Sequence, residues 1–303
     1  MNKKNILITG GSGFVGRNIV SLLRDQMPEY KIHNLSKMPL KMDGVSDIEC
    51  EAVTYDFQKL DIEFDYIIHL LALSNDKFCE NFSLSDDINV SFTKKVLEFA
   101  SKQKNLKKFI HLSSIIIYDN QNIPPVKEED RLFLNYTTYS FTKGVSEYYA
   151  DFYRHKFGLP IIIFRLSNIY GPYQEFNNSP FLVPSKIVQA IEEKKIEVFN
   201  LTPKRDWIYS GDAAEAIVKS LDSKITGTYN LAGGKGLSVE DIISSIARHF
   251  DVSYTSLDKP TNGPLNLYCD ISKIKKDLDW KPKTDLEEGI IKTIDYYRNE
   301  ASK

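Results

Sequence analysis

The chain has 303 residues, of which 42% are hydrophobic and 12% aromatic, enough to bury the core of a large α/β domain and a smaller lobe. Its 39 lysine and arginine residues nearly balance its 41 aspartate and glutamate residues, so its charge gives no reason to expect nucleic acid or an anionic membrane as a partner. We therefore expect a small-molecule partner.

Three cysteines, Cys50, Cys79 and Cys269, lie far apart, without a Cys-x-x-Cys pair and without histidines at metal-ligand spacing. This argues against a disulfide framework and a zinc site, and it favours a reducing compartment. The apolar run at residues 6–8 is too short for a signal peptide or a membrane span. We expect a cytoplasmic protein without a metal site.

The first predicted elements are a buried strand over residues 4–9, a glycine turn and an amphipathic helix. Gly10, Gly13 and Gly16 are each three residues apart, which lets the backbone turn tightly and approach a pyrophosphate closely. The N-terminus of the helix then faces the phosphates. A glycine pattern alone is weak evidence, but its place between a strand and a helix predicts a dinucleotide site.

The second predicted strand, residues 31–35, should end where an acidic residue would hold the adenosine ribose if the cofactor were NAD. The chain has Ser36 and Lys37 there instead. A hydroxyl and an ammonium suit a 2′-phosphate, so NADP(H) is favoured and NAD(H) is the alternative. Lys37 could equally be an ordinary exposed loop lysine.

Two further strands are predicted over residues 51–55 and 64–72, and the second is a nearly continuous apolar run typical of a parallel strand buried on both faces. His69 lies inside this run. A core histidine with satisfied hydrogen bonds is the simpler interpretation, so we assign it no chemistry.

A helix over residues 89–101 and a fifth strand over residues 108–114 follow, and the strand ends in Ser113-Ser114. Open α/β sheets place their chemistry at such strand ends. Tyr139 and Lys143 stand four residues apart on the next predicted helix, where an ammonium near a phenol favours the phenolate. By itself this spacing is more often a solvated helix face.

After a sixth strand over residues 161–164 the alternation loosens, with helices predicted over residues 184–195, 212–221, 239–250 and 286–298 and a strand over residues 229–231. We predict a Rossmann-type doubly wound parallel sheet in residues 1–170, to which later elements at about 205–232 return. Residues 171–303 would mainly form a smaller C-terminal α/β lobe that binds the substrate.

The glycine turn, Ser114 and the Tyr139-x-x-x-Lys143 pair stand in the order found in extended short-chain dehydrogenase/reductases. The sequence closely resembles the branch of that family that modifies nucleotide sugars. The resemblance covers nearly the whole chain, because residues 165–172, 205–209 and 277–282 also look like later motifs of the branch.

The resemblance implies that Tyr139 is the general acid or base at a sugar oxygen. Lys143 would lower the pKa of Tyr139 and hold the nicotinamide ribose, and Ser114 would hydrogen-bond the same sugar oxygen. A phenol and a hydroxyl at a carbonyl that accepts hydride stabilise the transition state more than the ground state.

The family's cofactor contacts correspond to residues in five parts of the chain, and its diphosphate contacts to Asn168 and Arg205. An arginine suits bidentate phosphate binding, although Arg205 could instead form only an interlobe ion pair with Asp206. Leu71 is bulkier than the residue usual at its position. With Ser36, Lys37, Tyr139 and Lys143, the expected cofactor site comprises Gly10, Gly13, Phe14, Val15, Gly16, Asp56, Phe57, Leu70, Leu71, Ala72, Asn89 and Leu166.

The sequence departs from the pattern of this branch at two places, and these departures restrict the reactions that we expect. Sugar 4,6-dehydratases carry an Asp-Glu pair directly after the strand-five Ser or Thr, where this chain has Ile115-Ile116. Apolar side chains cannot supply the acid and base that elimination needs. Near the C-terminus, residues 262–269 contain no arginine for the diphosphate, and whether Lys259 replaces it is open.

These observations favour an NADPH-dependent 4-ketoreductase of a nucleotide-linked sugar. The nearest alternative is a nucleotide-sugar 4-epimerase with tightly bound NAD, and a more remote one is a dinucleotide-sensing protein without catalysis. Sensors on this scaffold usually lose the Tyr or the Lys, which favours an enzyme. The sequence does not name the sugar or the nucleotide. The family resemblance also implies a possible homodimer through the helix that bears Tyr139.

Overall fold

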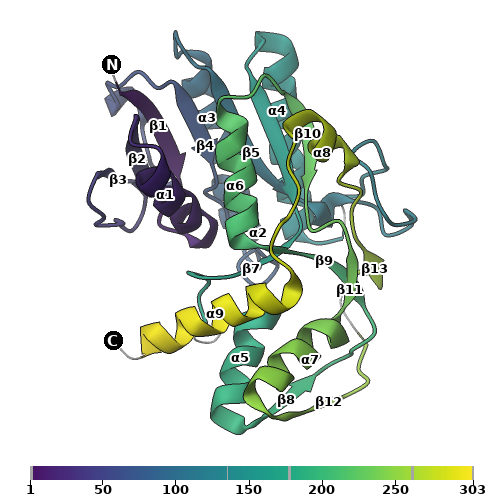
Figure 1. The fold of residues 1–303 in the computed structure, drawn as a ribbon. Helices are drawn as coiled ribbons and strands as arrows, with labels where there is room; N and C mark the ends of the chain where they lie inside the picture. The colour runs from purple at the N-terminus through teal and green to yellow at the C-terminus, as the bar shows by residue number, and fades with distance from the viewer. Residues whose placement is uncertain (1–2, 135, 177–178, 261–262, 302–303) are drawn as a thin grey trace.

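A parallel sheet buried on both faces forms the centre of the structure (Figure 1). The computed structural model describes residues 3–134, 136–176, 179–260 and 263–301, and within them the sheet has seven strands in the order β10-β6-β5-β4-β1-β2-β3. The order reverses between β1 and β4, so the predicted doubly wound Rossmann-type sheet is confirmed. Its strands are β1 (Lys4–Thr9), β2 (Tyr30–Ser36), β3 (Val45–Glu49), β4 (Tyr66–His69), β5 (Lys108–Ser114), β6 (Ile161–Leu166) and β10 (Gly227–Leu231).

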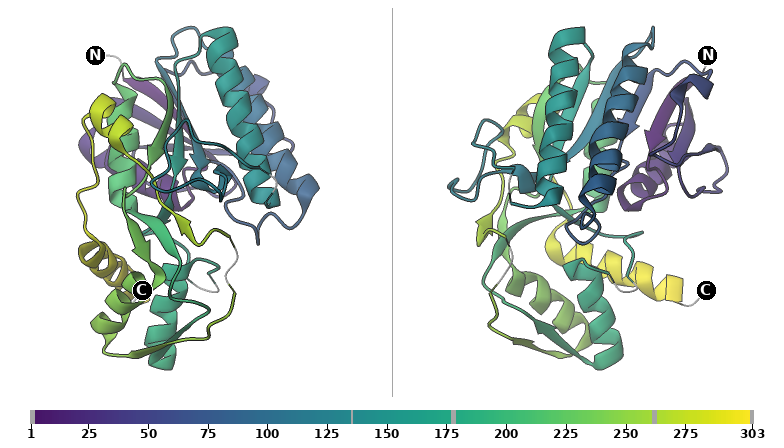
Figure 2. Two further views of the ribbon diagram at one scale, coloured as in Figure 1. Left: turned by 90° about the vertical axis from the view of Figure 1, so that its right-hand side faces the viewer. Right: turned by 180° about the vertical axis from the view of Figure 1, so that it is seen from behind.

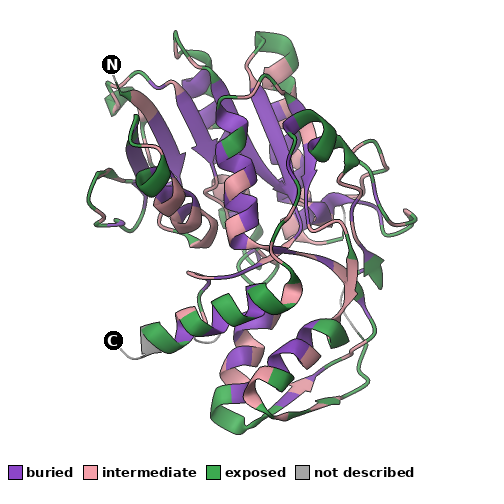
Figure 3. Ribbon diagram, in the orientation of Figure 1, coloured by how far each residue is buried: buried purple, intermediate pink, exposed green. Residues whose placement is uncertain are grey.

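Helices cover both faces of this sheet because its central strands carry apolar side chains on alternate sides. Ile6 and Ile8 of β1 pack with α1 (Phe14–Gln26) and α6 (Ser210–Leu221), and Leu7 packs with α3 (Phe92–Ser101) on the other face. α4 (Thr138–Phe157) lies beside α3, and α8 (Ser272–Leu278) lies near β10. Figure 3 shows the strands as the most completely buried part of the molecule.

A smaller lobe lies beyond the carboxyl ends of the central strands (Figures 1 and 2). Ile187, Ile243 and Ile290 form part of its core, one from each of its three helices. The lobe contains α5 (Leu182–Glu193), α7 (Val239–Phe250) and α9 (Leu286–Ala301), a small sheet of β7 (Asn168–Tyr170), β9 (Lys204–Tyr209), β11 (Gly236–Ser238) and β13 (Asn266–Leu267), and the paired strands β8 (Lys195–Val198) and β12 (Ser253–Ser256).

The chain passes between the two lobes several times. It leaves the main sheet after β6, forms β7, α5, β8 and β9 in the smaller lobe, and returns as α6 and β10. Several segments therefore cross between the lobes. β7, which follows β6 directly, pairs with residues 207–209 of β9, so the end of β6 lies beside β9.

Two local predictions differ from the structure. The third strand is β3 (Val45–Glu49), and the predicted strand over residues 51–55 is wrong, since most of that segment is turn. The helix predicted over residues 89–101 is preceded by α2 (Phe82–Asp86) and a π-helical turn (Asp87–Ser91), and its α-helical part begins at Phe92.

Candidate active site

The glycine turn between β1 and α1 forms a cradle for a phosphate group. Gly10 has φ of 74°, and a Cβ there would lie 2.9 Å from backbone atoms of Leu71, so this position favours glycine. A Cβ on Gly16 would collide with the backbone of Gly10. No side chain caps the first turn of α1, which leaves its N–H groups directed at the turn. This chain's residues therefore fit a dinucleotide pyrophosphate.

Ser36 and Lys37 lie at the carboxyl end of β2, beside this turn. The Ser36 hydroxyl donates to Asn34 Oδ1 at 2.6 Å and accepts from the Ser12 amide at 3.3 Å. Lys37 Nζ lies 3.1 Å from the Glu51 carboxylate, and its side chain is 76% exposed. The lysine is therefore held only by a surface ion pair, which a phosphate can replace at little cost.

The structure does not bring Asp56 and Phe57 to the cavity. Asp56 caps a short 3-10 turn (Phe57–Lys59) by accepting from the Gln58 amide, and the Phe57 ring packs against Phe92 and Phe99. Because β3 ends at Glu49, the residues that line the cavity after it are Cys50, Glu51 and Ala52. The third strand ends earlier in the chain than predicted, so residues 50–52 line the cavity in place of Asp56 and Phe57.

Asn89 also lies outside the cavity lining, where it supports the loop after β4. Its side chain accepts from the Leu73 amide at 2.7 Å and donates to the Leu73 carbonyl at 3.1 Å and to Thr142 Oγ1 at 3.0 Å. Asn89 thereby ties this loop to α4. The other expected cofactor residues that line the cavity are Gly10, Gly13, Phe14, Val15, Gly16, Leu70, Leu71, Ala72, Tyr139, Lys143 and Leu166.

Ser114 and Tyr139 meet at the carboxyl end of β5. Burial raises the pKa of Tyr139 to about 12, and a hydrogen bond with the Ser114 side chain opposes this shift. The phenol is consequently protonated at neutral pH. The helix that presents it begins with a capping box, in which the Thr137 and Ser140 side chains each bond to the other's backbone amide.

Lys143 follows Tyr139 by one turn of α4 and is buried. Its ammonium donates to the Leu112 carbonyl at 2.5 Å, and burial lowers its pKa to about 8 against the opposing effect of the Glu147 carboxylate. The phenol pKa is set instead by burial, Ser114, Cys79 and Asp76. We expected Lys143 to lower the pKa of Tyr139, but Lys143 is not among the main influences on that pKa in this structure.

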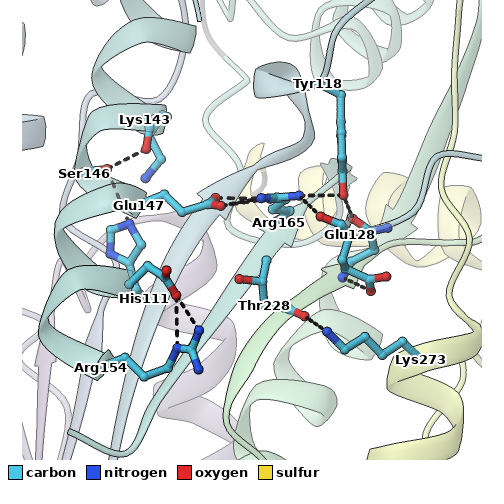
Figure 4. A network of polar contacts seen from close by, with 12 residues as sticks. His111, Tyr118, Glu128, Lys143, Ser146, Glu147, Arg154, Arg165, Thr228 and Lys273 are labelled. Atoms are coloured by element: carbon cyan, nitrogen blue, oxygen red, sulfur yellow. Dashed lines mark hydrogen bonds and ion pairs between the residues drawn. The ribbon is translucent and has the colours of Figure 1, made fainter. Parts of the chain in front are cut away.

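A buried polar network fixes the part of α4 that carries these residues (Figure 4). Glu147, one turn after Lys143, receives hydrogen bonds from the Arg165 guanidinium on β6, the shortest at 2.6 Å. The same guanidinium donates to the Tyr118 hydroxyl at 3.0 Å and to the Glu128 carbonyl at 2.8 Å. The network therefore joins α4 to the sheet directly behind the catalytic candidates.

His69 makes no contact that suggests chemistry. Its two ring nitrogens hydrogen-bond the hydroxyls of Thr9 at 2.7 Å and Thr93 at 2.8 Å, and burial lowers its pKa to about 3. It is a neutral core histidine whose hydrogen bonds are satisfied.

Ile115 and Ile116 follow Ser114 in a short 3-10 turn (Ile115–Ile117), and both line the cavity. Their side chains cannot exchange protons. The wall beside Ser114 and Tyr139 is therefore apolar at the two positions where elimination of water would need acid and base groups.

Arg205 and Asn168 line the cavity from the smaller lobe. The Arg205 guanidinium donates to the Lys204 and Leu265 carbonyls, each at 3.1 Å, and burial lowers its pKa. Asp206 does not pair with it, because the Asp206 carboxylate accepts from the amides of Gly233, Gly234 and Cys269. The ion pair considered from the sequence is therefore absent among the described residues, which leaves Arg205 available to a ligand anion.

A single cavity of about 1090 Å³ connects all these places, from the glycine turn to the smaller lobe. Its lining also includes residues that we did not expect from the sequence, and all of them except Trp207 on β9 lie in loops or at a helix start. They are Cys50, Glu51, Ala52, Asn75, Asp76, Asn120, Tyr136, Phe181, Leu182, Trp207 and Pro264. Lys259 is not among the lining residues, and its ammonium lies over the Phe199 ring.

Comparison with models of known protein families shows to which family this chain belongs. Residues 6–232 match the family model described as the NAD dependent epimerase/dehydratase family. The chain belongs to this family. The predicted resemblance to nucleotide-sugar epimerases and dehydratases of the extended short-chain type is thus confirmed, and the protein is an enzyme of the NAD-dependent epimerase/dehydratase family. A nicotinamide dinucleotide is the cofactor class of this family.

Two relatives of this epimerase/dehydratase family match over most of their length. The chain is 28% identical to a putative UDP-glucose 4-epimerase of Methanocaldococcus jannaschii, over 97% of this chain and 98% of that protein. It is 29% identical to a dTDP-glucose 4,6-dehydratase of Escherichia coli, over 97% of this chain and 93% of that protein.

Solved structures of the family share the fold. A UDP-glucuronic acid 4-epimerase from Bacillus cereus, in complex with UDP-glucuronic acid and NAD, superposes with a TM-score of 0.88 at 25% identity, over 98% of this chain and 99% of that chain. A UDP-N-acetylglucosamine 4-epimerase from Methanobrevibacter ruminantium gives 0.89 at 24% identity, over 99% and 100%. In the described part of this chain, no helix is both long and apolar enough to cross a membrane.

Proposed function

We propose that this enzyme transfers hydride at C4 of a nucleotide-activated sugar, as a 4-ketoreductase that uses NADPH. The observation that carries the proposal is the pairing of Ser114 with Tyr139 in a cavity whose adjoining wall is Ile115 and Ile116. Ser114 and Tyr139 can transfer one proton to or from one oxygen, but Ile115 and Ile116 cannot supply the acid and base that elimination of water needs. The putative 4-epimerase relative and the nucleotide-sugar complexes of the structural neighbours support the substrate class.

The protonation state of Tyr139 favours the reductive direction. With a pKa of about 12, the phenol is protonated near pH 7 and can act as the general acid that a ketone needs as its oxygen gains negative charge. The Ser114 hydroxyl stabilises the same developing charge. The bound dinucleotide supplies the hydride. Arg205 and Asn168 would hold the diphosphate and so fix the sugar at Tyr139.

A nucleotide-sugar 4-epimerase with NAD is the second candidate. The relatives favour it, since the chain is 28% identical to a putative UDP-glucose 4-epimerase and 25% identical to a UDP-glucuronic acid 4-epimerase whose structure holds NAD. The 4-ketoreductase consumes one NADPH for each sugar, whereas the epimerase interconverts two sugars without net oxidation. Mass spectrometry of the dinucleotide that leaves the denatured protein distinguishes the two, because tightly held NAD favours the epimerase.

Turnover of a UDP- or dTDP-linked 4-keto-6-deoxy sugar with NADPH tests the proposal, with Tyr139→Phe as the key variant. We expect turnover to fall on the order of 10²-fold to 10⁴-fold, while dinucleotide binding stays within about twofold because the phenol makes only part of the cofactor site. Tyr149→Phe is the matched control, since Tyr149 lies on the same helix but neither lines the cavity nor belongs to the exposed aromatic face. Equal turnover of the Tyr139→Phe variant and the wild type would refute the assignment.

We also propose that the enzyme forms a homodimer through the outer face of α4. Tyr148, Phe152 and Phe157 expose large aromatic side chains on this helix, at 59%, 53% and 54% exposure. The opposite face of α4 is buried against the sheet. A second copy of this chain would cover the exposed aromatic face.

A further inference from the structure

The charged residues that line the cavity lie in different parts of it, and the function proposed above gives one of them no role. Among the described residues they are Lys37, Glu51, Asp76, Lys143 and Arg205. Lys37 and Glu51 pair with each other at the ribose end, Lys143 lies buried behind Tyr139, and Arg205 lies at the smaller lobe. Asp76 remains.

Asp76 lies in a loop after β4 whose conformation is fixed. Asn89 holds Leu73 at the start of this loop through both of its amide atoms. The Cys79 amide donates to the carbonyls of Asn75 and Asp76, each at 3.1 Å, and closes a backbone turn over residues 75–79. Asp76 therefore has a defined position in the cavity wall.

Asp76 and Tyr139 line the same cavity, and the loop of Asp76 is tied to α4 near Tyr139, because Asn89 Nδ2 donates to Cys79 Sγ at 3.8 Å and to Thr142 Oγ1 at 3.0 Å. The charges of Cys79 and Asp76 also help to raise the pKa of Tyr139, whereas the Ser114 hydrogen bond lowers it. Among the described residues no cation forms an ion pair with Asp76, and its neighbour Lys77 is exposed and outside the cavity lining. Lys143 is directed at the Leu112 carbonyl. Asp76 is itself exposed, so it places a carboxylate without an ion-pair partner among the described residues in the wall of this part of the cavity.

We propose that Asp76 determines the class of sugar, by accepting hydrogen bonds from hydroxyl groups next to the reacting carbon and by repelling sugars that carry a carboxylate. The inference rests on the proposed function, because it places the reacting oxygen at Tyr139. The C6 carboxylate of a uronic acid is attached to C5, the neighbour of C4, and it would meet Asp76 as a like charge. The substrate is therefore a nucleotide-linked neutral sugar, unlike the UDP-glucuronic acid named for the Bacillus cereus relative.

Calorimetric binding of matched nucleotide sugars to the dinucleotide-loaded full chain tests this inference. The probes are UDP-glucose with UDP-glucuronic acid and dTDP-glucose with dTDP-glucuronic acid, so that each pair differs only at C6. We expect the wild type to bind the neutral member at least on the order of tenfold more tightly. Asp76→Asn should reduce this ratio on the order of tenfold, because it removes the charge and keeps the shape.

Glu80→Gln is the control, since Glu80 is an exposed acid four residues further on that does not line the cavity, and its change should leave the ratio as in the wild type. Asp76→Ser provides a second variant if Asp76→Asn folds poorly. A ratio near one in the wild type, or a ratio that Asp76→Asn and Asp76→Ser leave unchanged, overturns the inference and leaves the proposed function standing. If neither pair nor free UDP or dTDP binds, the proposed function itself fails, and the inference fails with it.

Discussion

The guanidinium of Arg165 on β6 lies 2.6 Å from the carboxylate of Glu147 on α4, and the two side chains are only 6% and 8% exposed. The arrangement is drawn in Figure 4. Glu147 stands one turn after Lys143, so the ion pair fixes the segment of α4 that presents Lys143 and Tyr139 to the cavity. The guanidinium also bonds the Tyr118 hydroxyl and the Glu128 carbonyl, so it has few unsatisfied donors.

Removal of only one partner of this pair should destabilise the fold strongly. Arg165→Met leaves the Glu147 carboxylate buried without its ion-pair partner, and we expect the free energy of unfolding to fall by roughly 3–5 kcal/mol. Urea denaturation measures this. The double variant Arg165→Met/Glu147→Leu should recover much of the loss, because neither charge of this pair then remains buried. A single variant as stable as the wild type would show that the pair is solvated in solution.

Lys143 should reduce stability at neutral pH, because a buried ammonium loses hydration. Its pKa is lowered to about 8 in the folded chain, against 10.5 when unperturbed, so the unfolded chain binds more protons between these values and stability rises with pH. Lys143→Met should therefore be more stable than the wild type at pH 7, on the order of 3 kcal/mol. This advantage should shrink as the pH rises from 8 toward 10.5.

Unfolding by urea at pH 7 and pH 9.5 measures the difference, and turnover should be lost at both pH values because Lys143 lies in the proposed catalytic set. Lys77→Met is the control, since Lys77 is exposed. An advantage that does not depend on pH would mean that Lys143 titrates normally in the folded chain.

The strands at the centre of the sheet could be predicted because they are buried on both faces and so are almost continuously apolar. The third strand could not. β3 lies at the edge of the sheet, and its sequence Val-Ser-Asp-Ile-Glu is largely exposed, so it carries no apolar alternation. The next segment, with Val53 and Tyr55, has more β-forming residues, so propensity predicts the strand there.

The same part of the chain limits what can be predicted about the site. The family resemblance implies that Asp56 and Phe57 contact the cofactor, whereas Glu51, just after β3, lines the cavity. Asp76 could not have been found by pattern, since its role depends on a loop conformation set by Asn89 and Cys79. By contrast, Ser114, Tyr139 and Lys143 belong to regular elements whose order fixes their meeting place.

Cofactor preference should depend on Ser36, Lys37 and Glu51. We expect NADPH to bind more tightly than NADH by on the order of 1 to 3 kcal/mol, through charge-assisted hydrogen bonds from Lys37 and Ser36 to the 2′-phosphate. Ser36→Asp with Lys37→Ala should reverse the preference, because a carboxylate suits the ribose hydroxyls and repels the phosphate. Fluorescence titration with both dinucleotides measures it.

Glu51→Gln provides a sharper test of the same idea. It removes the partner that lies 3.1 Å from Lys37 Nζ, so the ammonium is released and NADPH should bind more tightly while NADH changes little. Glu98→Gln is the matched control, because Glu98 forms a similar exposed ion pair with Lys102 at 2.8 Å and does not line the cavity. Tighter binding of NADH than of NADPH by the wild type would refute the argument from Ser36 and Lys37.

The aromatic face of α4 should control the oligomeric state. Tyr148 and Phe152 are four residues apart on one side of the helix, at 59% and 53% exposure, and Phe152 lies 6.1 Å from Phe157 between ring centroids. Phe152→Glu would place a carboxylate in the proposed interface without disturbing the core, so we expect a dimer to become a monomer in analytical ultracentrifugation. The free energy of unfolding of the monomer should change little, because surface substitutions usually stay within about 0.5 kcal/mol.

Phe199→Glu is the control for this experiment, since Phe199 is as exposed, at 63%, but lies in the smaller lobe directly after β8. Its change should leave the sedimentation coefficient unaltered, because the expected contact is made by α4. If Phe152→Glu and the wild type sediment alike as dimers, the second copy docks elsewhere. If the wild type is already a monomer at micromolar concentration, the exposed aromatic residues of α4 do not mediate self-association.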